Sequence, residues 1–497
     1  MDFIRNFPFF SIILSLFSGS VCSVLPSKAA RWVNTFVIVT CAVLSGATLF
    51  YVLQTGESFV YMMGHFPAPW GNEIRAGVLE ALMALFFCLI MLLSMLGGRK
   101  KVDEEILESK QNLFYILVNL MLTSLLALVY TNDLFTAYVF VEINTISACG
   151  LIMIRRIGRT FEAAVRYMIM SLVGSGMILF GLCMLYDLTG HLLMSNIQES
   201  VAKVMEVDAY HVPLLVTITL LVIGLAIKSA LFPFHAWLPD AYGYSTISSA
   251  AILSSLVSKG YIFLLIKIIY RVIGYDVFRS THIIDILFIF GLAGMIFGST
   301  SAIKEQDIRR MAAFSSVAQI GYIYMGIGLG TQESMIASVF HIFAHSCAKA
   351  LVFIGIIGLT DASGFNRHFS ELTGAGFRNK VAGIGFIVAS LSMVGVPVFA
   401  GFVSKLLFAR AAVLNTGKLL PTMIVLAIST ILNAIYFLKT GIRIYTPNNG
   451  SEYVSIPLKE EKTYGFAIIL FVVINVCLGM NSQPIVDMIH DGLAMFA

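Results

Sequence analysis

The chain has 497 residues, of which 58% are hydrophobic and only 12% are charged, and its formal net charge is +4. Globular proteins carry roughly 45–50% apolar and about 25% charged residues, so a soluble fold of this length could not cover so much apolar surface. The composition excludes a soluble enzyme, a nucleic-acid binder and a disordered chain, and it predicts an all-α polytopic membrane protein in the lipid bilayer.

A membrane-spanning helix needs about 20 mainly apolar residues. Fourteen segments meet this requirement, at 9–25, 32–53, 76–97, 113–130, 134–154, 167–188, 213–234, 245–270, 283–302, 312–329, 334–359, 382–408, 419–442 and 464–480. The connections between them are short, so no soluble domain is expected.

The basic residues of the connections fall mainly on one side of this predicted bundle. When alternate loops are assigned to opposite sides, 20 Lys and Arg residues lie on one side and 7 on the other. Short cytoplasmic loops are enriched in Lys and Arg, so the side with 20 is predicted to be cytoplasmic. We therefore expect a multi-pass protein of the cell (plasma) membrane with both termini on the extracytoplasmic side.

Five lysines fall inside predicted spans, where each costs roughly 2.5–3.5 kcal/mol on insertion scales. They are Lys228, Lys259, Lys267, Lys349 and Lys405. Lys267 lies near the end of its span and is expected to extend to the surface, so no role is predicted for it. The other four are expected to face protein, carboxylates or water.

A carboxylate, Glu142, also lies inside a span, eight residues after the start of that span. An isolated buried carboxylate takes up a proton, whereas a nearby lysine keeps it ionised. Residues of this kind usually mark ion pathways, so we expect Glu142 to belong to a proton path. The alternative is a static ion pair that only holds helices together.

Lys228 begins the run KSALFPFHAWLPDA, in which Pro233 is expected to break the helix. Proline removes a backbone donor and clashes one turn back, and the freed carbonyls need partners inside the protein. Lys228 is placed to donate to them, and His235 follows the break. We assign both residues to the predicted proton path.

A second polar group lies on the segment HIFAHSCAKALVF, where His341, His345 and Lys349 share one helix face. Histidine titrates closest to neutral pH, so such a row suits proton transfer. Two histidines at this spacing can also ligate a metal, but no Glu or Cys lies on that face, and we expect no metal. Lys259, in the middle of a Ser-rich span, is the fourth candidate group.

Lys405 follows Gly395, Pro397 and Gly401 in GVPVFAGFVSK, which predicts a second interrupted helix. Two interrupted, Lys-bearing helices in corresponding halves of a chain indicate an internally repeated transporter. Spans 4–8 and 9–13 would form inverted five-helix repeats with breaks in helices 7 and 12. The expected divisions are 1–112 (three helices), 113–270 (first repeat), 283–442 (second repeat) and 464–497 (last helix and tail).

The Glu142 span, KSALFPFHAWLPDA, KEQDIRRMAAFSSVAQIGYI, HIFAHSCAKALVFIGIIGL and GVPVFAGFVSK together resemble one family over residues 113–410. It is the family of antiporter-like proton-translocating subunits of respiratory complex I, group 4 membrane-bound hydrogenases and Mrp cation/proton antiporters. The resemblance implies fourteen helices with inverted repeats, other membrane subunits as partners, and H⁺, either alone or in exchange for Na⁺, as the transported ion. Because position 405 is Lys rather than Glu, the chain resembles the Mrp D subunit or the complex I L subunit more than the complex I M subunit.

The same resemblance implies roles for the candidate residues. Glu142 is expected to pair with Lys228 in a first half-channel, Lys259 and the two histidines to form a central relay, and Lys405 to lie on the outlet side. No redox or hydrolytic site and no cofactor are expected, so any electron chemistry belongs to partner subunits. Two alternatives stay open: a quinone- or haem-binding subunit of an oxidoreductase, suggested by His341 and His345, and a stand-alone secondary transporter.

Overall fold

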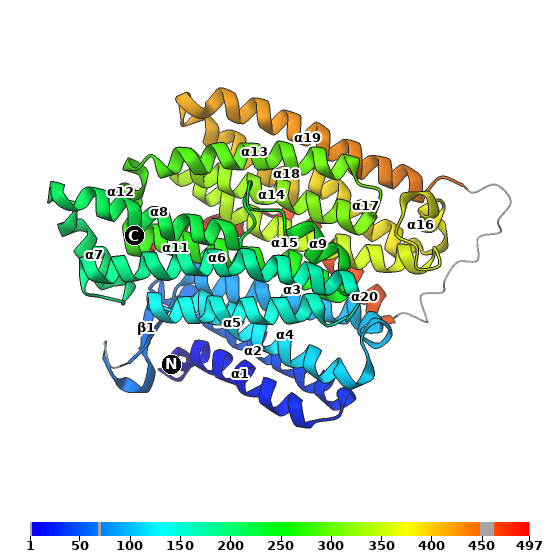
Figure 1. Cartoon of the computed structure of the whole chain (residues 1–497), viewed down its shortest axis with the longest axis horizontal. Coiled ribbons are helices and arrows are strands. Elements are labelled where there is room, and N and C mark those ends of the chain that lie inside the picture. Colours follow the sequence, from blue (N-terminus) through cyan, green and yellow to red (C-terminus); the bar gives the residue numbers. More distant parts are fainter. Residues whose placement is uncertain (1, 68–70, 448–461, 497) are drawn as a thin grey trace.

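The computed structural model describes residues 2–67, 71–447 and 462–496 as a bundle of long helices that lie side by side (Figure 1). Thirteen helical segments within these residues are long and apolar enough to cross a membrane. This confirms an all-α, multi-pass membrane protein, because nearly every apolar stretch of the sequence forms one such helix.

Twelve of these segments are single α-helices: α1 (Phe7–Val24), α2 (Ser27–Thr55), α3 (Val78–Glu105), α4 (Glu108–Tyr130), α5 (Leu134–Met153), α6 (Gly158–Thr189), α8 (His211–Lys228), α13 (Ile283–Lys304), α14 (Ile308–Leu329), α15 (Gln332–Asp361), α19 (Thr416–Ile444) and α20 (Lys462–Met480). The thirteenth is composite and consists of α10 (Ile247–Ile252), the π-helical turn η4 (Leu253–Val257), α11 (Ser258–Ile268) and the π-helical turn η5 (Ile269–Ile273).

The expected fourteenth span is present as two half-helices, each too short to span alone. α17 (Lys380–Val394) ends before Pro397, and α18 (Ala400–Val413) resumes after it. The other predicted break is also confirmed, since α8 ends at Lys228 and the short helix α9 (Leu238–Tyr244) begins after Pro233. The first helices of the two predicted repeats, α4 and α13, run in opposite directions, as inverted repeats require.

The two ends of the bundle differ in character. Both chain ends lie at one end, on the left of Figure 1, which we call the terminal end. The turns 25–26, 106–107, 154–157, 305–307 and 362–379 lie at the opposite end, which we call the basic end because it carries the Lys- and Arg-rich connections. The prediction that the basic end is cytoplasmic stays a prediction.

Short elements cover both ends. At the terminal end, strands β1 (Phe59–Met62) and β2 (Glu73–Ala76) form an antiparallel hairpin in which Val60 pairs with Arg75. The remaining short elements are η1 (Asp2–Asn6), η2 (Met63–His65), α7 (Met194–Val204), η3 (Asp208–Tyr210), α12 (Tyr275–Ser280), η6 (Phe369–Leu372), α16 (Ala375–Arg378) and α21 (Gln483–Ala494).

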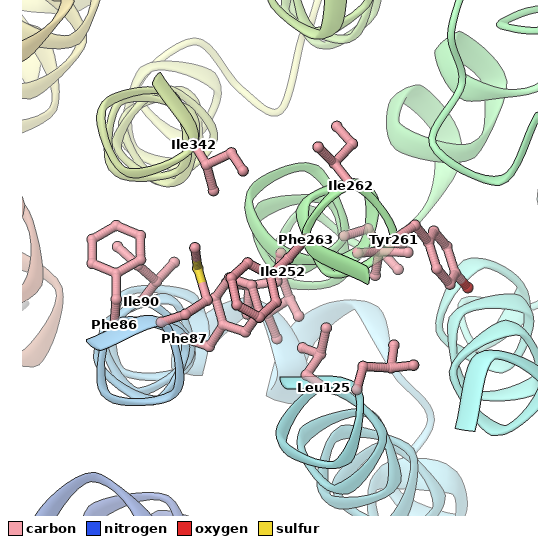
Figure 2. Close-up of a cluster of buried hydrophobic side chains, with 14 of the residues drawn as sticks. Phe86, Phe87, Ile90, Leu125, Ile252, Tyr261, Ile262, Phe263 and Ile342 are labelled. Carbon is pink, nitrogen blue, oxygen red and sulfur yellow. The ribbon is translucent and has the colours of Figure 1, made fainter. Parts of the chain in front are cut away.

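The centre of the bundle consists of the composite helix α10–η5 and helix α15, whose apolar spans are buried throughout. Figure 2 shows how they are enclosed: Phe86, Phe87 and Ile90 of α3 lie close to Phe263 of α11, and Ile342 comes from α15. These two helices carry Lys259 and the two histidines. The polar candidates of the sequence therefore lie inside the most apolar part of the protein.

Helices α13 and α14 approach each other closely because glycines face backbone at the contact. A Cβ atom added at Gly291 would lie 2.4 Å from the backbone nitrogen of Met325, and one added at Gly298 would lie 2.5 Å from that of Ala318. Small residues allow such close packing between helices in membranes.

Replacing Gly291 by Val is therefore expected to force the two helices apart and to lower the free energy of unfolding by about 1–3 kcal/mol, the usual range for overpacking. Thermal unfolding of the purified protein in detergent measures the effect. Gly176→Val is the matched control, because nothing lies within 4 Å of a Cβ added at Gly176 on α6. Equal unfolding temperatures for the two variants would contradict the prediction.

Candidate proton path

The first broken helix presents Lys228 to α5. Its ammonium lies 3.2 Å from Glu142 Oε1 and donates to Thr145 Oγ1 at 2.7 Å. The sequence predicted that Lys228 would donate to carbonyls freed by the break; instead, its ammonium donates to these two side chains of α5. The expected pairing with Glu142 is present in the structure.

Glu142 lies at the edge of the bundle. The Ser175 hydroxyl of α6 donates to its Oε1 atom, which also accepts from Lys228. Its side chain is 27% exposed, whereas that of Lys228 is fully buried. Lys228 thus faces the protein interior, whereas Glu142 reaches the outer surface of α5.

Tyr261 lies beside this pair, on the helix that also carries the next candidate. Its hydroxyl lies 3.3 Å from Thr145 Oγ1, and the Lys228 ammonium lies 5.9 Å from the centre of its ring. Tyr261 is on α11, two residues after Lys259. Tyr261 carries no charge, so it was not identified from the sequence.

Lys259 is fully buried and lies two residues after the end of the π-helical turn η4. Its ammonium donates to the backbone carbonyl of Ser254, inside that turn. A π-helical turn widens the backbone and is frequent at functional sites. The turn thus supplies the lysine with a partner without any carboxylate.

His341 and His345 stack on each other within α15, with ring centres 5.7 Å apart. His341 Nδ1 lies 2.6 Å from the Ser404 hydroxyl, and both ring nitrogens of His345 are buried without a hydrogen-bond partner among the described residues. Haem ligation by two histidines needs rings on opposite sides of one iron, whereas these rings lie side by side. Lys349, one turn further, donates to Ala312 O at 2.6 Å and to the Ser315 hydroxyl.

Lys405 lies next to the second break. Its ammonium donates to Val394 O, the last carbonyl of α17, at 2.6 Å and to Thr430 Oγ1 at 2.9 Å. It is therefore Lys405, and not Lys228, that satisfies a carbonyl freed by a break. The preceding residue, Ser404, contacts His341.

These contacts bring most of the predicted residues into one row through the middle of the bundle. His341 is within electrostatic range of both Lys259 and Lys405, and His345 is within range of Lys259 and Lys349. His235 lies apart: its ring stacks on Phe232, which stacks on Phe297 at the outer surface of α13. Its place in the path stays a prediction.

Comparison with known proteins shows the family. A family model described as "NADH:quinone oxidoreductase/Mrp antiporter, TM" matches residues 131–432, which include every candidate residue of the row. The chain belongs to this family.

Three known proteins that are similar to this chain come from different kinds of membrane complex. The NADH-quinone oxidoreductase subunit N of Desulforudis audaxviator is 32% identical and is matched over 87% of this chain and 85% of its own length. A chain of the membrane-bound sulfane sulfur reductase (MBS), an archaeal respiratory membrane complex, has a TM-score of 0.88 at 23% identity and coverages of 100% and 98%. A chain of the Mrp complex from Dietzia sp. DQ12-45-1b has a TM-score of 0.87 at 22% identity and coverages of 99% and 97%.

This antiporter-family chain holds a second buried charge cluster at the terminal end that sequence reasoning did not identify. The prediction that Lys267 reaches the surface is wrong: it is fully buried and donates to Val129 O at 2.8 Å and to Thr131 O at 2.5 Å. The long side chain of Lys267 reaches two carbonyls at the end of α4. Arg75, Glu80 and Arg271 are buried beside it.

Proposed function

We propose that this protein conducts protons across the membrane along the row from Glu142 to Lys405, as a subunit of a larger membrane complex. The observation that carries the proposal is the series of titratable groups inside the bundle, Glu142–Lys228, Lys259, His345–His341 and Lys405. Tyr261 lies beside the first pair, and Ser404 contacts His341. Ionisable residues inside membrane helices mark ion pathways and proton relays.

Charge coupling supplies the driving step. Two unit charges 4 Å apart interact by about 4 kcal/mol at an effective dielectric constant near 20. A proton gained or lost at one group therefore changes the proton affinity of its neighbour by an energy of this size. Lys228 and Glu142, at 3.2 Å, are close enough for this coupling, and the stacked histidines continue the series.

Neighbouring membrane subunits are the proposed partners. Glu142 is 27% exposed on α5, and Lys405 is partly exposed on α18. Charged groups inside a membrane are costly when they face lipid. We therefore expect neighbouring subunits to cover Glu142 and Lys405. The similar chains of the MBS and Mrp complexes are also parts of multisubunit assemblies.

The identity of the complex and of a second ion is part of the same proposal. Lys405 favours a subunit like Mrp D or complex I L over complex I M. Our proposal is a subunit most like Mrp D or its membrane-bound hydrogenase counterpart, which moves H⁺ either alone or in exchange for Na⁺. The 32% identical relative is instead named as a subunit N. The genes next to the one that encodes this chain test the assignment. Genes for small Mrp-type subunits indicate an antiporter, and genes for hydrogenase or ferredoxin-binding subunits indicate a redox-driven pump.

Replacing Lys259 by Met in the assembled complex is expected to reduce proton transport by at least about a hundredfold, within the range that one positioned proton-transfer group contributes. Met keeps the length of the side chain but cannot carry a proton between the two halves of the row. A pH-sensitive dye inside vesicles measures the rate. Lys203→Met, at an exposed position in the last turn of α7, is the control. Full transport by the Lys259→Met complex would reject the proposed function.

A further inference from the structure

Helix α3 reaches the outer surface of the bundle along one narrow stripe. Every residue from 78 to 98 is buried except four leucines at helical spacing, which we call the leucine stripe: Leu85, Leu89, Leu92 and Leu96. The inner side of α3 carries Phe86, Phe87 and Ile90, which point into the bundle (Figure 2). The leucine stripe is therefore the one part of this segment of α3 that a molecule outside the bundle can contact.

Helices α2 and α20 both pack against α3 and project further outward than the stripe. A Cβ atom added at Gly46 of α2 would lie 3.9 Å from Leu85 Cδ1, so α2 directly borders the stripe. Leu89 is 36% exposed and the other three leucines less. The apolar residues that α2 and α20 expose are more accessible than this and include Phe36, Val39 and Val43 of α2 and Phe466, Ile469 and Val473 of α20. The stripe is thus recessed relative to these two helices.

The length of the stripe matches one leaflet of a bilayer. Leu96 follows Leu85 by 11 residues, which corresponds to about 16 Å along a helix. The hydrocarbon core of a bilayer is about 30 Å thick, so each leaflet contributes about 15 Å. Directly after the stripe, α3 becomes charged at Arg99 and Lys100. The stripe therefore spans the hydrocarbon of the leaflet at the basic end, and Arg99 lies at the level of the lipid headgroups.

Arg99 lies between two hollows at the end of the leucine stripe. The first has a volume of about 150 Å³, and its lining includes Arg31, Trp32 and Leu96. The second has a volume of about 210 Å³, and its lining includes Lys100 and again Leu96. Arg99 lines both hollows. The apolar stripe thus leads into a space that contains two guanidinium groups.

The two arginines differ in their partners. Arg31 Nη2 lies 2.5 Å from Asp103 Oδ1, and Arg31 Nε donates to the Tyr115 hydroxyl at 3.0 Å. The exposed guanidinium of Arg99 has neither a hydrogen bond nor an ion pair among the described residues. Arginine binds phosphate through two parallel N–H groups. The hollows therefore hold one more positive than paired negative charge, on a group suited to a phosphate.

Trp32 places this site at the membrane surface. It lies in the second turn of α2, is 70% exposed and lines the same hollow as Arg99. Tryptophan is enriched where the hydrocarbon core meets the headgroups. The position of Trp32 thus agrees with the level that the length of the leucine stripe gives for Arg99.

We propose that the leucine stripe and the hollows at its end bind one anionic phospholipid of the leaflet at the basic end. Arg99 and Arg31 hold the phosphate, and an acyl chain lies on the stripe between α2 and α20. Basic pockets between membrane helices bind anionic headgroups. A helix of another subunit could cover the leucines, but it gives no counter-charge to Arg99 at headgroup level. The site lies outside the row from Glu142 to Lys405, so the inference does not rest on the proposed function.

Trp32 serves as the reporter in the test, because bromine atoms on a lipid quench the fluorescence of a tryptophan that they contact. The purified complex is placed in phosphatidylcholine nanodiscs that contain a minor fraction of phosphatidylglycerol. Bromine near the headgroup end of the acyl chains is carried either by the phosphatidylglycerol or by an equal amount of phosphatidylcholine. Subtracting the signal of the Trp32→Phe complex removes all other tryptophans. Brominated phosphatidylglycerol is expected to quench Trp32 at an about fivefold lower mole fraction, the effect of one cation on an anionic headgroup.

Arg99→Gln is expected to remove this preference, because it deletes the unpaired guanidinium. Lys304→Gln is the matched control and is expected to leave the preference unchanged. Lys304 is an exposed cation in the last turn of α13, and α13 lies at the opposite edge of the bundle from α2 (Figure 1). Equal quenching by the two lipids, or an unchanged preference in Arg99→Gln, would overturn the proposal. So would the absence of quenching by either lipid, which would show that protein covers Trp32.

A second reporter tests the acyl chain. In the Trp32→Phe chain, Leu92→Trp places a tryptophan on the leucine stripe, seven residues before Arg99. It is expected to show the same preference for brominated phosphatidylglycerol. Ile431→Trp is the control at similar depth, since Ile431 is 61% exposed on α19 and lies eight residues before Lys439. Both lipids are expected to quench it equally. A tryptophan at 92 that does not distinguish the two lipids would overturn the assignment of the stripe to this phospholipid.

Discussion

A complex that carries Glu142→Ala or Lys228→Ala is expected to lose ion transport by at least about a hundredfold, because each variant removes a positioned proton-transfer group. Both variants are expected to assemble, since Lys228 retains Thr145 and Glu142 retains Ser175 as hydrogen-bond partners. Transport is measured with a pH-sensitive dye in vesicles, and assembly by the size of the purified complex.

The double variant separates a proton path from a static ion pair. Removing one member of a buried pair leaves an unpaired charge, whereas removing both is often nearly neutral for stability. The double variant Glu142→Ala/Lys228→Ala is therefore expected to unfold at a higher temperature than the single variant Glu142→Ala, in which Lys228 is left unpaired. The double variant is expected to stay inactive. Recovery of transport in the double variant would show that the pair only holds α5 and α8 together.

The spans and their breaks could be predicted because they depend on local properties of the chain. Long apolar segments require helices in a membrane, and Pro233 and Pro397 interrupt helices wherever they lie. The cost of buried charge likewise singled out Lys228, Lys259, Lys349 and Lys405. The structure confirms the apolar spans and both breaks, whereas the part of these lysines in transport stays a prediction.

The partners of these charges could not be predicted, because they depend on how distant helices pack. Nothing in the sequence shows that η4 is π-helical, so the contact between Lys259 and Ser254 was not foreseen. Tyr261 was missed because an uncharged residue costs little inside a membrane. Lys267 was misplaced because a lysine near a helix end extends to the surface in many proteins, whereas here β2 and α21 cover that end.

Hydrogen bonding distinguishes His345 from the buried charge cluster at the terminal end. Lys267 is held by two backbone carbonyls, and Arg75 by a carboxylate, a hydroxyl and a carbonyl. His345, in contrast, has two unpartnered ring nitrogens among the described residues. A group whose hydrogen bonds are all fixed is suited to hold structure, whereas a group with free sites is suited to exchange protons.

Glu80→Gln is therefore expected to destabilise the protein without acting on transport directly. Glu80 Oε1 accepts from Arg75 at 2.9 Å, and its Oε2 accepts from the backbone of Gly77 at 3.0 Å, which caps α3. Arg75 in turn donates to Ser58 Oγ at 2.9 Å and to Met495 O, so the Glu80–Arg75 pair links α3 and the β-hairpin to the residue after α21. Lys267 and Arg271 add two more buried cations within electrostatic range of Glu80.

Neutralising Glu80 leaves these cations without their buried counter-charge, and the free energy of unfolding is expected to fall by about 3–5 kcal/mol, the usual loss when one member of a buried ion pair is removed. Thermal unfolding in detergent measures this. Glu162→Gln, whose side chain is 63% exposed beside Arg166, is the matched control and is expected to change stability by less than about 1 kcal/mol. A Glu80→Gln protein of unchanged stability that fails to transport protons would instead assign this cluster to the proton path, because a structural carboxylate acts only through the fold it supports.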